Sequence, residues 1–170
     1  MLALFALSLL LVSCNSIAQD EISSSLAEGI APSDTTTPTL SVSNVTAKAG
    51  KSIEVIVSIQ NNPGILGMKF SLSWDEDALT LTNVKNGDAL ENLTYQPPSN
   101  EKSGCNFLWY GAETGKIEDG EILKLTFKVS RSASEKDYGI TLVTDSGDNF
   151  DSEFNSISFD AKNGKVSVIE

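Results

Sequence analysis

The stretch "GMKFSLSW", Gly67 to Trp74, decides the fold class. Every second residue is large and apolar, at Met68, Phe70, Leu72 and Trp74, and the residues between them are small or polar. Side chains along a strand alternate between the two faces of a sheet, so this period of two predicts a strand with one buried face. The buried face supplies a core, and the polar face is left free for another role.

Alternating runs of the same kind recur from Leu40 to the end of the chain. The predicted strands lie at 40–47, 52–60, 67–74, 79–84, 92–96, 105–111, 121–129, 138–144, 156–159 and 164–169. Turn residues separate them, as in Asn-Asn-Pro-Gly at 61–64. A series of about nine short strands at near-regular spacing predicts an all-β antiparallel sandwich, in which two sheets share one core.

The N-terminus carries a targeting segment. Residues 1–13, "MLALFALSLLLVS", are too short for a membrane span of about 20 residues and are typical of the apolar region of a secretory signal. "LVSC", Leu11 to Cys14, resembles a bacterial lipoprotein box, which implies lipidation of Cys14. The alternative is an ordinary signal cleaved after Ala18. Lipidation leaves Cys105 without a partner and excludes the other possibility, a Cys14–Cys105 disulfide.

A stalk and one domain follow the signal. Residues 14–38 are rich in Ser, Thr, Pro and acidic side chains, as in "SDTTTPT" at 33–39, and offer nothing to bury. This composition predicts a flexible stalk. The sandwich domain is then expected over 39–170, held at the bacterial cell surface through the lipid alone and monomeric.

Charge and composition exclude several classes of function. The chain has 12 Lys and Arg against 23 Asp and Glu, a net charge of −11, and no His. Such an acidic surface disfavours nucleic acid and anionic lipid headgroups. Zinc sites usually need His or several Cys, so no zinc is expected. The acidic loop 145–153 offers oxygen ligands for calcium but lacks EF-hand spacing, and we interpret it as a solvated loop.

No enzymatic constellation is present in the sequence. The adjacent carboxylates Asp75, Glu76 and Asp77 lie in a predicted turn without a cleft. Glycoside hydrolysis would need two carboxylates on either side of the bond that is cleaved. There is no nucleophile elbow, no Gly-rich phosphate loop and no Ser-His pair. We therefore predict no catalytic residue, no metal and no cofactor.

The strand at 105–111 breaks the one-sided pattern. Phe107 and Trp109 point to one face, whereas Leu108 and Tyr110 point to the other. Because a two-sheet sandwich covers only one face of each sheet, Leu108 and Tyr110 are expected on an outer face. Two stray exposed side chains would also fit, since such residues are common.

Neighbouring strands would surround this apolar pair with polar groups. If 105–111 pairs with 67–74, the residues beside Leu108 and Tyr110 are small or polar. They are Lys69, Ser71 and Ser73 on one side, with Thr94 and Gln96 on the other. An apolar centre with a polar surround is the composition of a protein-binding face.

Three segments resemble cohesin domains. They are "AGKSIEVIVSIQNNPGILGMKFSLSWDEDALTLTNVKNGDAL" (49–90), "GEILKLTFKVSRSASEKDYGITL" (120–142) and "KNGKVSVIE" (162–170). The resemblance implies a nine-stranded jelly-roll sandwich. It also implies that the partners are dockerins, small helical modules of polysaccharide-degrading enzymes, and that calcium is carried by the dockerin.

The family binds dockerins through one sheet that includes its third and sixth strands. Carried over by position, the resemblance implies a binding site made of Lys69, Ser71, Ser73, Leu108, Tyr110 and Gly111, with Glu113 as the nearest carboxylate. The predicted function is thus a non-catalytic anchoring module at the cell surface.

Two alternatives stay open at this point. One is a carbohydrate-binding module of similar jelly-roll fold, which would need two or three exposed rings in a line. Trp74 and Trp109 are expected to point inward, and Tyr110 stands nearly alone. The other is a solute-binding or adhesin lipoprotein.

Overall fold

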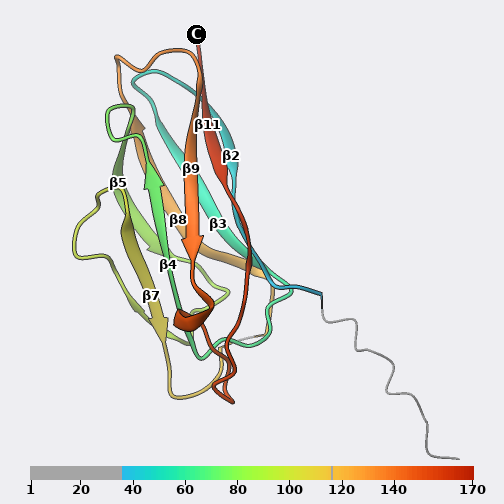
Figure 1. The fold of residues 1–170 in the computed structure, drawn as a ribbon. Coiled ribbons are helices and arrows are strands. Elements are labelled where there is room, and N and C mark those ends of the chain that lie inside the picture. The colour runs from blue at the N-terminus through green and yellow to red at the C-terminus, as the bar shows by residue number, and fades with distance from the viewer. Residues whose placement is uncertain (1–35, 116) are drawn as a thin grey trace, which may run out of the picture. The chain divides into compact units, whose positions relative to one another are not determined.

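Two packed β-sheets make up the part of the chain that the computed structural model describes, residues 36–115 and 117–170 (Figure 1). The predicted signal at 1–13, Cys14 and nearly all of the predicted stalk lie outside these residues. No helix within the described ranges has both the length and the apolar character needed to cross a membrane.

One sheet has five strands in the order β10–β1–β3–β8–β5. Its strands are β1 (Thr39–Val42), β3 (Ser52–Gln60), β5 (Leu79–Asn86), β8 (Gly120–Val129) and β10 (Asp160–Lys162). The other sheet has six strands in the order β2–β11–β9–β4–β7–β6. Its strands are β2 (Asn44–Lys48), β4 (Gly67–Trp74), β6 (Thr94–Gln96), β7 (Cys105–Tyr110), β9 (Asp137–Thr144) and β11 (Gly164–Ile169), with the short 3-10 helix η1 (Ser146–Asp148) after β9.

The sandwich is confirmed, but the expected count of nine strands is wrong, because the described residues form eleven. The predicted strand at 40–47 is broken at Ser43. Ser43 N donates to Ile56 O, and Ser43 Oγ accepts from Ile56 N, both at 2.9 Å. The break lets β1 pair within the five-stranded sheet and β2 pair within the six-stranded one.

The expected strand at 156–159 is also misplaced. Ser156 makes only an isolated bridge to Phe150, and the strand forms three to four residues later as β10. There, Asp160 N donates to Pro38 O at 2.9 Å. The pairs β1–β10 and β2–β11 are parallel, so the sandwich is not wholly antiparallel as expected.

The core follows the predicted alternation. In β4, all four apolar side chains of the "GMKFSLSW" stretch are buried. Phe70 lies at the centre of an aromatic cluster, with ring centroids 5.6 Å from Phe107 and 5.5 Å from Trp109. Tyr95 of β6 adds a further ring, 5.0 Å from Trp109. The six-stranded sheet is therefore held to the core by rings from three adjacent strands.

A polar contact also joins the two sheets. Trp109 of β7 is fully buried, and its indole Nε1 donates to Asn86 Oδ1 at the end of β5, at 2.8 Å. Buried indole N–H groups need a partner, because an unsatisfied donor loses its full hydration energy. Asn86 therefore satisfies the one polar atom of the largest core side chain.

Replacing Asn86 with alanine is expected to lower the free energy of unfolding by about 1–3 kcal/mol, because the Trp109 N–H is left unpaired. Urea unfolding followed by tryptophan fluorescence measures this change. Asn83→Ala, an exposed substitution on the same strand, is the control and is expected to change stability by less than about 0.5 kcal/mol. Equal losses in both variants would contradict the assigned role of Asn86.

Candidate partner-binding site

The outer face of the six-stranded sheet, turned away from the other sheet, brings the predicted residues of β4 and β7 together. The antiparallel register places Lys69 opposite Leu108 and Gly67 opposite Tyr110. Directly opposed residues on one face of such a pair lie side by side. The expectation that Lys69, Leu108 and Tyr110 share a face is confirmed.

The flanking strands complete this face as expected. On one side, β6 places Thr94 opposite Tyr110 and Gln96 opposite Leu108. Leu108 is half-buried, and Tyr110 is 48% exposed. Leu108 is thus bordered by Lys69 and Gln96, whereas Tyr110 has the polar neighbour Thr94 on one side and Gly67 on the other.

On the other side, β9 contributes a residue that the sequence reasoning missed. Ser71 and Ser73 are half-buried on the outer face and lie opposite Val143 and Thr141. Val143 is 56% exposed. Its outward position follows from the alternation in β9, but only the strand order places it beside Ser71.

Trp74 and Trp109 face the core, as predicted. Trp74 is 7% exposed and Trp109 is fully buried. Trp74 packs edge-on against Phe127 of the opposite sheet, with ring centroids 5.1 Å apart. Neither indole is available on the surface.

Gly111 and Glu113 both lie after the end of β7, although Gly111 was expected within this strand. The predicted strand 105–111 ends at Tyr110. A Cβ at Gly111 would lie 2.7 Å from Leu93 Cδ2, so this position is turned toward the interior. Glu113 is exposed in the connection after β7.

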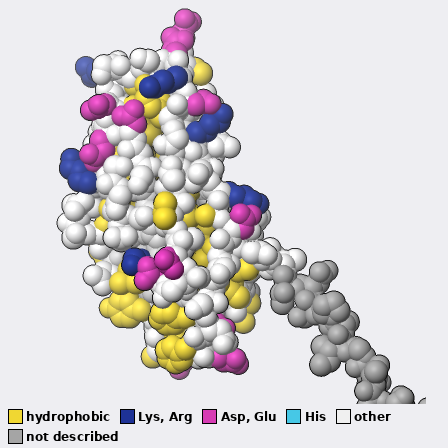
Figure 2. Space-filling model, in the orientation of Figure 1, with side chains coloured by type: hydrophobic (Ala, Val, Ile, Leu, Met, Phe, Trp, Pro, Cys, Tyr) yellow, Lys and Arg dark blue, Asp and Glu magenta, His cyan; other side chains and the backbone are white. Residues whose placement is uncertain are grey.

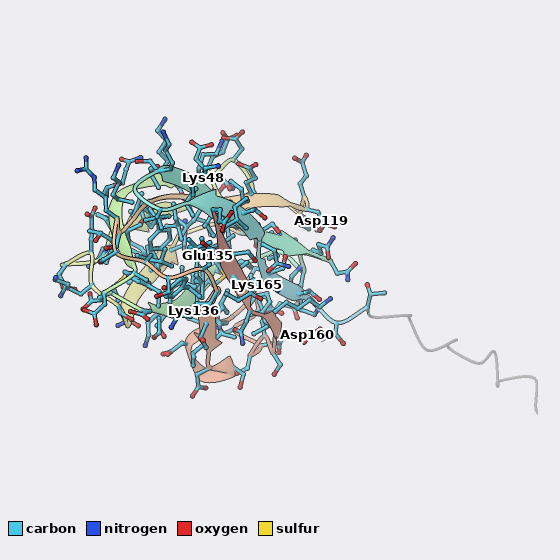
Figure 3. All side chains as sticks on the ribbon, turned by 90° about the horizontal axis from the view of Figure 1, so that it is seen from above. Lys48, Asp119, Glu135, Lys136, Asp160 and Lys165 are labelled. Atoms are coloured by element: carbon cyan, nitrogen blue, oxygen red, sulfur yellow. The ribbon has the colours of Figure 1, made fainter. Side chains whose placement is uncertain are left out.

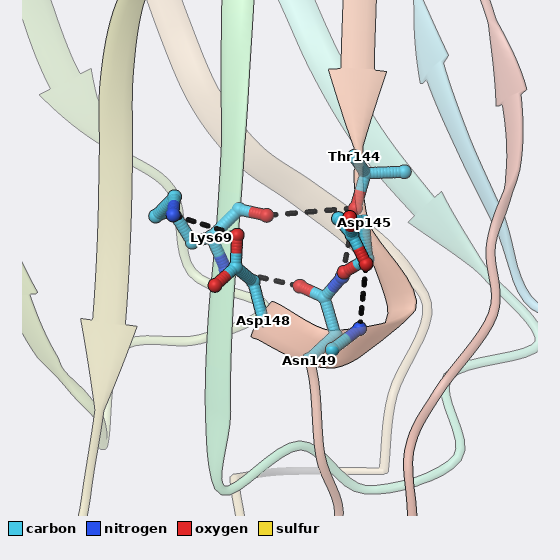
Figure 4. A network of polar contacts seen from close by, with 6 residues as sticks. Lys69, Thr144, Asp145, Asp148 and Asn149 are labelled. Carbon is cyan, nitrogen blue, oxygen red and sulfur yellow. Dashed lines mark hydrogen bonds and ion pairs between the residues drawn. The ribbon is translucent and has the colours of Figure 1, made fainter.

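Lys69 has an internal partner that the sequence did not predict. Its Nζ lies 2.6 Å from Asp148 Oδ2 of η1 (Figure 4). The ammonium group of Lys69 is therefore already paired within the domain. A surface pair of this kind contributes about 0–1 kcal/mol to stability, so its main effect is to fix and neutralise Lys69.

Asn149 fastens the same loop to β4. Its Oδ1 accepts from Lys69 N at 3.0 Å, and its Nδ2 donates to Thr144 Oγ1 at 2.8 Å and Asp145 O at 2.5 Å. The side chain is almost fully buried. Figure 4 shows these contacts closing the end of β9 against β4. Asn149 holds the loop after β9 on the edge of the outer face.

A groove of about 510 Å³ lies on the outer face beside Leu108. Lys69, Gln96, Asn106 and Leu108 line one part of it, and the β6–β7 loop at 97–104 lines the rest. Pro97 and Pro98 begin this loop. Because proline has no N–H to donate, the pair ends the β6–β7 ladder and lets the loop stand away from β7.

Cys105 is buried at the start of β7 and lies beside this groove. Burial raises the pKa of its thiol to about 11, with a further contribution from Glu101. At neutral pH the thiol is therefore protonated and a poor nucleophile.

The acidic residues at 145–153 are used by the protein itself. Asp145 Oδ1 accepts from Gly147 N, Asp148 pairs with Lys69, and Asp151 caps a turn. Within the described ranges, no group of three or more His, Cys, Asp and Glu side chains is placed to hold a metal ion.

The fold is that of a jelly-roll sandwich with one exposed sheet face. Residues 38–168 match the family described as "Cohesin domain", so the chain belongs to the cohesin domain family. The chain is also similar to a cellulosome-anchoring protein of Acetivibrio thermocellus, with 31% identity over 147 residues. The match covers 80% of this chain and 32% of that relative, so the chain spans about a third of its length.

Solved structures show the same fold. The cohesin of a type I cohesin–dockerin complex from Clostridium thermocellum has 25% identity and a TM-score of 0.67, covering 78% of this chain and 93% of that one. A second such complex from the same organism gives 22% identity and a TM-score of 0.69, with coverages of 79% and 100%. A non-cellulosomal cohesin from the archaeon Archaeoglobus fulgidus gives 19% identity and a TM-score of 0.69, with coverages of 79% and 93%.

Proposed function

We propose that this domain is a non-catalytic anchoring module that binds dockerin modules of polysaccharide-degrading enzymes through the outer face of its six-stranded sheet. The observation that carries the proposal is the register of β4, β6 and β7, which sets Leu108 between Lys69 and Gln96 and places Tyr110 beside Thr94 on the same outer face. The cohesin–dockerin complexes among its structural relatives support the same partner.

The chemistry of the face suits a helical protein partner. Leu108, Tyr110 and Val143 offer apolar contact, while Ser71, Ser73, Thr94 and Gln96 offer hydrogen bonds around them. Such an apolar centre within a polar rim is the usual anatomy of a protein interface. A carbohydrate-binding module would use exposed tryptophans for stacking, and both tryptophans here are buried.

Calorimetric titration with calcium-loaded dockerin modules from the same genome tests the proposal. We expect at least one of them to bind with a Kd of about 1 μM or tighter, equivalent to about −8 kcal/mol. Excess EDTA is expected to abolish binding, because calcium belongs to the dockerin, and to leave the Tm of this domain alone unchanged. Failure of every module to bind, or a Tm that falls with EDTA, would contradict the proposal.

We also propose that the chain is a lipoprotein, lipidated at Cys14 and displayed outside the cell. Acyl chains on this residue would supply enough buried methylene groups for stable anchoring. The cellulosome-anchoring relative supports a cell-surface location.

Fractionation of cells that express the full chain tests the anchor. The wild-type protein is expected in the membrane fraction, and Cys14→Ala is expected either in the medium or as an uncleaved precursor. Cys105→Ala is the matched control and should stay in the membrane fraction. A Cys14→Ala protein of mature size that remains in the membrane fraction would contradict lipidation.

A further inference from the structure

The loop after β9 places aromatic rings on the outer face at the end where Gly67 and Tyr110 lie. Phe150 and Gly67 exchange backbone hydrogen bonds, at 2.9 Å and 3.2 Å. A Cβ at Gly67 would lie only 2.3 Å from Phe150 Cζ, so the ring occupies the space of the missing side chain. Since Gly67 lies opposite Tyr110, the Phe150 ring and Tyr110 are neighbours on this face.

Phe154 extends this group into solvent. Its ring stacks on Phe150 with centroids 5.8 Å apart and an interplanar angle of 21°. It is 75% exposed, the highest value among the large apolar side chains of the described residues. Tyr110 therefore has aromatic neighbours at this end of the face, although the sequence suggested that it stands nearly alone. Figure 2 shows hydrophobic side chains gathered at this lower end of the molecule, below a pair of opposite charges.

The protein holds Phe154 outward at an energetic cost. Its φ is +61°, a conformation that bulky residues rarely adopt. Asp151 Oδ1 accepts from Glu153 N and Asn155 N, both at 2.9 Å, and Phe154 N donates to Asp151 O at 3.1 Å. The hydrogen bonds from Asn155 hold the pKa of Asp151 below its usual range, so the carboxylate that ties this turn stays charged.

Negative charge surrounds the rings. The loop carries Asp145, Asp148, Asp151 and Glu153. Lys69 is the cation that the structure pairs with this loop, and it is bound to Asp148. The end of the face is thus apolar at its centre and acidic at its rim. The charged residues labelled in Figure 3 lie outside this loop. One of them, Lys165, pairs with Asp137 at 2.6 Å.

We propose that Tyr110, Phe150 and Phe154 form an aromatic platform that binds an aliphatic side chain on a dockerin helix, flanked there by Lys or Arg. This inference rests on the proposed function and adds a specific contact to it. Two observations favour such an occupant. The platform is continuous with the outer face through the Gly67–Tyr110 pair, and its acidic rim complements a basic segment.

Phe154→Asn tests the platform, because asparagine tolerates a positive φ and removes only the ring. Titration of the calcium-loaded dockerin that binds the wild type is expected to show about a tenfold loss of affinity, equivalent to about 1.4 kcal/mol. Phe154→Leu keeps apolar surface and should lose about threefold or less. The Tm of Phe154→Asn should not fall, because the ring is exposed and its backbone is strained.

The control is Ile169→Asn, which changes another exposed apolar residue at the end of β11. It is expected to bind like the wild type. Unchanged affinity in Phe154→Asn, with wild-type binding present, would overturn the platform and leave the proposed function intact. Absence of wild-type binding to every dockerin would overturn both. Loss of binding to insoluble polysaccharide, with dockerin affinity unchanged, would assign the rings to sugar and also overturn the proposal.

Discussion

Replacing Leu108 with arginine is expected to weaken dockerin binding by about 100-fold or more, equivalent to about 2.7 kcal/mol. Leu108 lies on the outer face between Lys69 of β4 and Gln96 of β6 in the register. A guanidinium group there would be desolvated on binding without an anionic partner beside it, because Asp148 already pairs with Lys69 and Gln96 is uncharged. Burial of a charge without a partner costs several kcal/mol.

The fold should survive this substitution. Leu108 is half-buried on the side away from the core, while Phe107 and Trp109 on either side carry the packing of β7. We expect the Tm to change by only a few degrees. Thr126→Arg is the matched control, since Thr126 is also half-buried and faces outward from β8 in the other sheet. If Thr126→Arg abolished binding and Leu108→Arg did not, the partner would bind the five-stranded sheet, which would contradict the proposal.

Phe70→Ala is expected to lower the free energy of unfolding by about 3–5 kcal/mol, the usual cost of emptying a large aromatic site in a core. The ring is 1% exposed, stacks on Trp109 and packs at a tilt against Phe107. Many domains have a total stability of only about 5–15 kcal/mol, so this loss is large. Urea unfolding measures it directly.

The adjacent substitution Ser71→Ala is the control. Ser71 faces outward and is expected to change stability by about 0.5 kcal/mol or less. The contrast between two consecutive residues tests the alternation of β4 itself. Similar losses at both positions would mean that this strand does not have one buried and one solvent-facing side.

The fold class could be predicted because alternation is a local signal. Each residue of "GMKFSLSW" faces the side that its polarity indicates. In β7, where apolar residues occur on both faces, the alternation with Phe107 and Trp109 predicts that Leu108 points outward. Cross-strand neighbours then follow from pairing, so most of the candidate face was predicted before strand order was known.

Features that depend on long-range contacts could not be predicted. The break at Ser43 leaves the alternation of 40–47 undisturbed, because its cause is a pair of hydrogen bonds to Ile56 on another strand. Similarly, "SISF" at 156–159 buries Ile157 but has no partner strand, and pairing starts only at Asp160.

The site residues that were missed share this origin. Asp148 and Asn149 are far from Lys69 in the sequence. The polar composition of their loop is compatible both with a solvated loop and with a loop that packs against β4. Phe150 and Phe154 belong to no alternating run. One local clue was Gly67, where the outward position of β4 lacks a side chain and so leaves room for a ring.

An NMR titration of the isotopically labelled domain with its calcium-loaded dockerin tests the central claim most directly. We expect backbone amide shifts to change on β4, β6, β7 and β9, with the largest changes around Lys69 and Leu108. Amides of β3 and β8 should stay unchanged. Changes confined to the five-stranded sheet, in a complex that forms with measurable affinity, would contradict the claim that the outer face of the six-stranded sheet binds the partner.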